Sequence, residues 1–157
     1  MTPEQRELRD ALAEVPTRAA SVAPVRISTT ARARSSVAPD GAPAPGDWSA
    51  REVVLHLAAV DDGVWQPRLD ALAAEDFPSW PWVEPGLWTG PGDTTFEGAV
   101  TLLEATRAAT VARLDALDDA GWSRQGRHAT YGVLDVAALM RIALRHDEEH
   151  LAQIRRG

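Results

Sequence analysis

The stretch GDWSAREVVLHLA, residues 46–58, contains the clearest helix start in this sequence. Ser49 and Glu52 are spaced as a capping box, in which the serine hydroxyl accepts from an early backbone N–H and the glutamate reaches back to the cap. The apolar residues that follow at helical spacing are Val53, Leu57, Val60 and Val64. The pattern predicts a helix that continues to about Ala74, with a bend at Pro67.

Three further segments have the apolar spacing of amphipathic helices. They are residues 3–20, residues 94–121 and residues 134–155. The segment at 94–121 opens with Thr94-Thr95-Phe96-Glu97, which fits a second capping box, and ends at Gly121.

Two stretches rich in proline, residues 22–47 and 77–93, connect these helices, and no strand pattern is visible. We therefore predict an all-α four-helix bundle in a single domain, residues 1–157. The long crossover between helices two and three permits these two to run parallel, whereas short links would make neighbours antiparallel.

The composition excludes several classes of function. The chain has no cysteine, which rules out disulfides, thiolate metal sites and a cysteine nucleophile. A net charge of −7 opposes nucleic-acid binding, which depends on clustered basic residues. No apolar run approaches the roughly 20 residues needed to span a bilayer, and the first residues do not resemble a secretory signal. We expect a cytoplasmic protein with no nucleic acid and no membrane as a partner, in which any metal is held by His, Asp or Glu.

Three of the four histidines lie on the predicted apolar faces of helices. His56 lies between Val53 and Val60 in the second helix. His146 and His150 are one turn apart in the last helix, so their rings can reach a common point. Neutral imidazoles are costly in a core unless their nitrogens have partners, and a divalent metal would supply one. Three protein ligands would also leave a coordination position open for water or substrate.

The spacing alone does not decide between a metal site and histidines that are simply part of the core. A lone histidine on an apolar face is more often structural, and most H-x-x-x-H pairs are not ligands. Residues 146–150, HDEEH, also fit the H-x-x-E-H pattern of inverted zinc proteases, with Glu149 as base. Those enzymes need another acidic ligand far downstream, and only seven residues follow His150. The fourth histidine, His128, lies in a polar stretch and is predicted to be at the surface.

Two stretches of the chain resemble a known family, the DinB-like proteins. Residues 46–58 are similar to the family's W-S-x-x-[ED]-[VI]-x-x-H-[LV] entry to helix two. Residues 146–154, HDEEHLAQI, are similar to its H-x-x-x-H-x-x-Q-[IL] ending. The likeness covers most of the chain from the first stretch onward. It implies an up-down-down-up bundle, a divalent metal on His56, His146 and His150, and a homodimer.

The resemblance also implies an activity. Studied relatives include transferases and isomerases in which the metal binds the sulfur of bacillithiol or mycothiol as a thiolate. We therefore predict a metal-dependent thiol S-transferase that acts on a small-molecule substrate in detoxification or stress response. Zinc or nickel is the expected metal, with iron, manganese or cobalt as alternatives. Two other functions stay open, a metal-dependent hydrolase and a non-catalytic metal-binding stress protein.

Other side chains are candidates for the surroundings of the site. Asp61 and Asp62 follow the first histidine closely enough to orient a ligand. Arg68, Arg141 and Arg145 are candidates to bind a carboxylate of a thiol cofactor, although a solvated helix surface is the commoner place for arginine. The aromatic residues expected to plug the core, cover the crossover or line the pocket are Trp48, Trp80, Trp82, Trp88 and Tyr131.

Overall fold

A computed structural model describes residues 1–22, 48–83 and 93–156 of the chain. Its helices are α1 (Pro3–Ser21), α2 (Ala50–Val60), the π-helical η3 (Asp61–Trp65), α3 (Gln66–Ala74), α4 (Phe96–Asp115), α5 (Asp119–Trp122) and α6 (Val136–Arg156). Its strands are β1 (Ser79–Trp80), β2 (Gln125–His128) and β3 (Gly132–Asp135). Residues 23–47 of the predicted first connection, and Trp88, lie outside the described residues.

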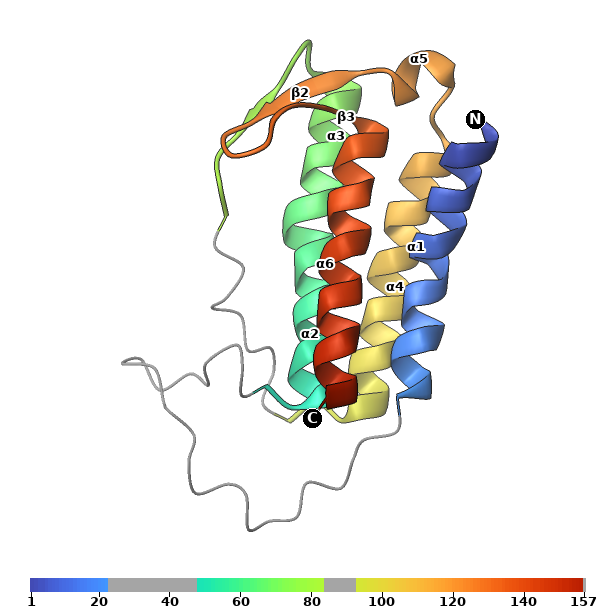
Figure 1. The fold of residues 1–157 in the computed structure, drawn as a ribbon, viewed down its shortest axis with the longest axis vertical. Coiled ribbons are helices and arrows are strands. Elements are labelled where there is room, and N and C mark those ends of the chain that lie inside the picture. The colour runs from blue at the N-terminus through green and yellow to red at the C-terminus, as the bar shows by residue number, and fades with distance from the viewer. Residues whose placement is uncertain (23–47, 84–92, 157) are drawn as a thin grey trace.

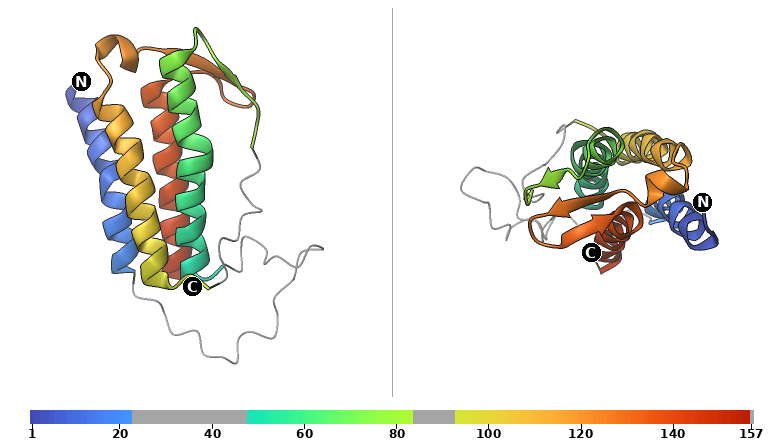
Figure 2. Two further views of the ribbon diagram at one scale, coloured as in Figure 1. Left: turned by 180° about the vertical axis from the view of Figure 1, so that it is seen from behind. Right: turned by 90° about the horizontal axis from the view of Figure 1, so that it is seen from above.

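The long helices form a bundle of four columns, which are α1, the continuous α2–η3–α3, α4 and α6 (Figure 1). α1 and α6 run one way along the bundle, and the α2–η3–α3 column and α4 run the other way (Figures 1 and 2). α4 packs against α1 and α2, and α6 packs against the same two helices. The chain is therefore mostly helical, as predicted.

The capping box at the start of α2 is confirmed. Ser49 accepts from the backbone N–H of Glu52, whose carboxylate accepts in return from the Ser49 N–H at 2.8 Å. The predicted helix also reaches Ala74, but η3 interrupts its regular turns. Pro67 lies in the first turn of α3, directly after η3.

The second predicted capping box is wrong. α4 is capped by Thr95, whose hydroxyl accepts from the Gly98 N–H at 3.0 Å. The third helical position is therefore a glycine, which has no side chain to reach back to the cap. α4 also ends at Asp115, and Gly121 belongs to the separate short α5.

A small sheet, which the sequence pattern did not predict, lies at one end of the bundle (Figure 1). β2 and β3 form an antiparallel hairpin, and β1 joins β2 in parallel so that Trp80 lies beside His128 in the register. Gly126 is required in β2 because a Cβ there would lie 2.4 Å from the Trp80 ring. The hairpin turn ends at Gly132, whose φ of 74° favours glycine.

Two clusters of buried apolar side chains fill the bundle. The cluster at the sheet end includes Trp65 and Trp122, and the other includes Leu103 and Leu151. His146 lies between the two clusters along α6. Among the described residues, no helix combines the length and the apolar character needed to cross a membrane.

Candidate metal centre

The structure brings together the three histidines that the sequence singled out. His56 is on α2, and His146 and His150 lie on successive turns of α6. One ring nitrogen of each histidine lies within 4.8 Å of the others. Nε2 of His56 and Nε2 of His146 are 3.2 Å apart.

This geometry fits a metal with imidazole ligands. Two nitrogens bound to one tetrahedral zinc ion at about 2.0–2.1 Å lie about 3.3–3.4 Å from each other. Nδ1 of His56 and Nδ1 of His146 are buried and have no hydrogen-bond partner in the described part of the chain. A divalent ion bound to the facing Nε2 atoms would fix the protons of these rings on Nδ1, where each needs an acceptor of its own.

The surroundings of His56 and His150 favour the neutral imidazole that a metal requires. His56 is 1% exposed, and burial, together with the neighbouring His150 and His146, lowers its pKa to about 3. Burial and His146 also lower the pKa of His150. At neutral pH these two rings therefore present a lone pair without first losing a proton.

Two side chains orient and cover the cluster. Oε1 of Gln153 accepts from Nδ1–H of His150 at 3.0 Å, which leaves Nε2 of His150 as its ligand atom. The buried ring of Trp48 lies 4.7 Å from that of His56, centroid to centroid, and stacks on His150 at 6.0 Å. The expectation that Trp48 plugs the core is confirmed, and its ring covers one side of the histidines.

A buried ion-pair network that the sequence analysis did not predict adjoins the histidines. Arg107 of α4 is 1% exposed, and it donates to Asp61 at 2.7 Å and to Asp147 at 2.8 Å. Oδ1 of Asp147 lies 3.6 Å from Nδ1 of His146. Neither atom has a hydrogen-bond partner among the described residues, and a shift of about half an ångström would join them in the carboxylate–histidine pair common at metal ligands. Asp61 is thus connected to the site through Arg107, whereas Asp62 is exposed.

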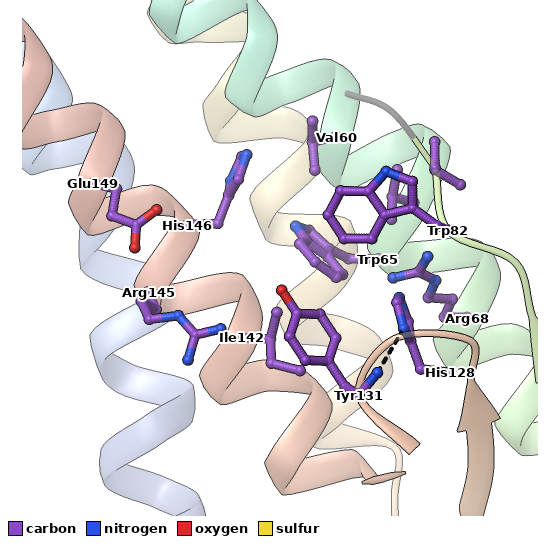
Figure 3. Close-up of a pocket in the computed structure, with 12 residues that line it drawn as sticks. Val60, Trp65, Arg68, Trp82, His128, Tyr131, Ile142, Arg145, His146 and Glu149 are labelled. Atoms are coloured by element: carbon purple, nitrogen blue, oxygen red, sulfur yellow. Dashed lines mark hydrogen bonds between the residues drawn. The ribbon is translucent and has the colours of Figure 1, made fainter. Parts of the chain in front are cut away.

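A cavity of about 230 Å³ lies beside the histidines, between the η3–α3 part of one column and α6 (Figure 3). The π-helical turn helps to form its wall, because an extra residue rotates the side chains that follow by about 100° relative to α2. Trp65, at the end of η3, lies with its ring centroid 6.2 Å from that of His146. His146 also lines the cavity, so the histidine cluster borders it there. No fourth His, Asp or Glu joins the three histidines within the described ranges, which matches an open site.

Two of the three candidate arginines line this cavity. Arg68 enters it from α3 and Arg145 from α6 (Figure 3). Arg141 instead pairs with Glu4 at the surface of the bundle.

The aromatic candidates divide between the cavity and the core. Trp82 and Tyr131 line the cavity, and both side chains are substantially exposed. Trp80 is buried against Gly126 under the sheet.

The prediction that His128 is a surface residue is wrong. Alternate residues of β2 face the bundle, so His128 is only 2% exposed and lines the cavity. Its Nδ1 accepts from the backbone N–H groups of Thr130 and Tyr131 at 3.0 and 3.3 Å. Burial and the nearby Arg68 lower the pKa of His128 and keep the ring neutral.

The fold and the site together define a helical bundle with a three-histidine cluster at the edge of a small cavity. The sequence profile of the DinB superfamily matches residues 2–154, and the chain belongs to this superfamily. The family resemblance of the sequence is thereby confirmed.

A comparison with curated proteins finds no match. Among solved structures, the chain is similar to YfiT from Bacillus subtilis, with a TM-score of 0.73 and 21% sequence identity over 99% of this chain and 87% of that chain. YfiT is described as a probable metal-dependent hydrolase with an unusual four-helix bundle topology. At this identity the likeness shows a shared fold.

Proposed function

We propose that this protein is an enzyme that uses a divalent transition metal, held by His56, His146 and His150, to act on a small molecule in the adjacent cavity. The observation that carries the proposal is the group of three ring nitrogens within 4.8 Å of one another, one of them from a histidine that lines the cavity. Zinc or nickel is the proposed metal, with iron, manganese or cobalt as alternatives, because imidazole suits all of them.

The chain's own residues have separate tasks in this proposal. A bound divalent ion would supply Lewis acidity toward a sulfur or oxygen of the ligand at neutral pH. Gln153 orients His150, and Asp147 would orient His146 after the small shift described above. Trp48 and Trp65 limit the access of water to the histidines. The small molecule enters on the cavity side, next to His146.

The first candidate reaction is transfer of a low-molecular-weight thiol, of the bacillithiol or mycothiol type, to an electrophile. It is supported by the family to which the chain belongs and by a site without a fourth protein ligand among the described residues. In the test reaction with 1-chloro-2,4-dinitrobenzene, the sulfur attacks the aromatic carbon, a C–S bond forms, the C–Cl bond breaks, and the thiol proton passes to solvent. Detoxification or stress response is the proposed setting.

The test compares metal-loaded and metal-free protein with each thiol and this electrophile. Turnover is expected only in the metal-loaded protein and is expected to disappear in His146→Ala. The matched control is Arg113→Gln, which changes a distant surface ion pair and should keep full activity. Absence of metal-dependent turnover with both thiols would rule out this candidate.

Hydrolysis is the second candidate, because Glu149 lines the cavity together with His146. Glu149 lies on the same helix, directly before His150 and one turn after His146, and in this candidate its carboxylate takes the proton of an attacking water. The hydrolase description of the structural neighbour YfiT supports the same reaction class. Metal-dependent cleavage of 4-nitrophenyl acetate that is lost in Glu149→Gln, but kept in Glu148→Gln, would favour this candidate. Equal loss in both variants would argue against it.

A non-catalytic metal-binding stress protein is the remaining alternative. It predicts full metal loading with no turnover in either assay. The homodimer and the cytoplasmic location remain predictions from the sequence.

A further inference from the structure

Arg68 is a buried arginine for which no carboxylate partner exists among the described residues. Its side chain is 6% exposed in a wall of the cavity, between the rings of Trp65 and Trp80 at 5.5 and 6.0 Å. Its one hydrogen bond in the described ranges is long, 3.4 Å, and goes to the carbonyl of Pro81. A buried cation without a counter-ion is costly. An anion bound in the cavity would offset this cost.

His128 offers a second hydrogen-bond donor next to Arg68. Because its Nδ1 accepts two backbone N–H groups, the proton of the neutral ring must be on Nε2. Figure 3 shows the imidazole and the guanidinium side by side on one wall of the cavity. Two neighbouring donors that are held in place by buried contacts suit the two oxygens of a carboxylate.

The charge around the cavity matches a monoanion better than a dianion. His128 is neutral, so Arg68 is the single cation that the described residues contribute to this wall. At the exposed rim, the charge of Arg145 is offset by that of Glu149, one helical turn away. The remaining surface is largely apolar and aromatic, with Trp82 and Tyr131 facing the cavity (Figure 3).

We propose that Arg68 and His128 bind the carboxylate of a small organic monocarboxylate whose apolar body lies against Trp82 and Tyr131. The reactive end of this ligand would then point toward His146, on the opposite wall. Only the direction of the ligand, with its reactive end toward His146, rests on the proposed function; binding of the carboxylate does not.

The test is an NMR titration of metal-free protein with 3-phenylpropionate, with the uncharged 3-phenylpropionamide and with inorganic phosphate. The carboxylate is expected to bind saturably, and the amide and phosphate about tenfold or more weakly, because the charge-assisted hydrogen bonds are lost or mismatched. Arg68→Gln should weaken 3-phenylpropionate binding by at least about tenfold. The matched control, Arg127→Gln, removes the same charge from the exposed neighbour of His128 and should bind within about twofold of wild type.

Equal binding of acid and amide, tighter binding of phosphate, or wild-type affinity in Arg68→Gln would overturn the proposal. If circular dichroism shows that Arg68→Gln does not fold, His128→Gln is titrated in its place, with the same loss expected. Because these titrations measure binding without metal, a protein that takes the carboxylate but no metal would refute the proposed function and leave this inference standing.

A second titration distinguishes whether the carboxylate belongs to a thiol ligand or to a substrate without a thiol. On zinc-loaded protein, 6-mercaptohexanoate is compared with hexanoate. Tighter binding of the thiol acid assigns the carboxylate to a thiol ligand, and equal binding assigns it to a substrate without a thiol. Saturable binding of hexanoate supports the subsite in either case, and its absence contradicts the subsite.

Discussion

Arg107 and Arg68 are both buried arginines, but they differ in what surrounds them. Arg107 lies between the carboxylates of Asp61 and Asp147 in the interior of the bundle. Arg68 has no such partner among the described residues and lies at a cavity. The charge of Arg107 is therefore balanced by carboxylates of the protein, whereas that of Arg68 can be balanced by a bound ligand.

The histidine cluster belongs with Arg68 in this comparison. His146 and Asp147 are consecutive in α6, yet Asp147 is ion-paired to Arg107 while nitrogens of the imidazole cluster lack partners in the described ranges. His146 and Arg68 line the cavity, whereas Arg107, Asp61 and Asp147 do not.

The largest loss of stability is predicted for a substitution of Arg107, the ion-paired arginine. Arg107→Met leaves two buried carboxylates without their partner, so the free energy of unfolding of metal-free protein should fall by about 3–5 kcal/mol. Arg113→Met, which breaks the exposed pair with Asp70, should cost less than about 1 kcal/mol. Urea denaturation measures both, and similar losses in the two variants would mean that the interior network does not carry the stability assigned to it.

The histidine cluster should make the metal-free protein sensitive to acid. The pKa of His56 is lowered to about 3 in the fold, so below pH 6.5 the unfolded chain binds more protons and the free energy of unfolding falls as the pH falls. Between pH 7.5 and 5, wild type should lose about 2 kcal/mol more than His56→Gln. The raised pKa of Asp61, about 6, acts in the opposite direction but is present in both proteins. Parallel pH profiles of stability for the two proteins would contradict the assignment.

A further loss of stability is expected at Gly126 of β2, which packs against Trp80, the ring beside Arg68. Gly126→Ala would place its Cβ against the Trp80 ring and should destabilise the protein by about 1–3 kcal/mol. Gly63→Ala in η3 is the control, because its Cβ would meet nothing within 4 Å and alanine favours helix, so it should be neutral or slightly stabilising. Thermal unfolding of both variants checks this, and a neutral Gly126→Ala would show that Trp80 can move away from β2.

The smallest change in stability is predicted for a substitution of Arg68. Arg68→Met leaves no carboxylate unpaired in the described structure, so the free energy of unfolding without ligand should stay within about 1 kcal/mol of wild type. Urea denaturation under the conditions used for Arg107→Met gives the direct comparison. A loss as large as that of Arg107→Met would mean that Arg68 is a structural residue.

Local signals in the sequence were sufficient for much of this fold. The Ser49–Glu52 capping box and the apolar spacing predicted α2, and the spacing of His146 and His150 placed both rings on one face of α6. The helical class followed from these local signals, whereas the convergence of His56 with His146 and His150 was implied by the family resemblance, because spacing alone left it open.

The parts that were not predicted depend on distant partners. β2 is four residues long and contains no apolar residue, so its strand has no alternating pattern, and the burial of His128 depends on packing against other elements. No pattern in the sequence predicted the π-helical turn η3. Arg107 did have one, since it lies four residues after Leu103 and seven before Leu114 on the buried stripe of α4, but its two carboxylates come from other helices.

A competition titration of untagged, chelator-treated protein with zinc and nickel would show whether His56, His146 and His150 bind a divalent metal. Wild type is expected to bind one equivalent per chain, and His56→Ala and His150→Ala should lose at least about a hundredfold in affinity. His128→Gln, which alters the histidine outside the cluster, should bind metal like wild type. Equal, negligible binding by wild type and the two alanine variants would contradict the claim.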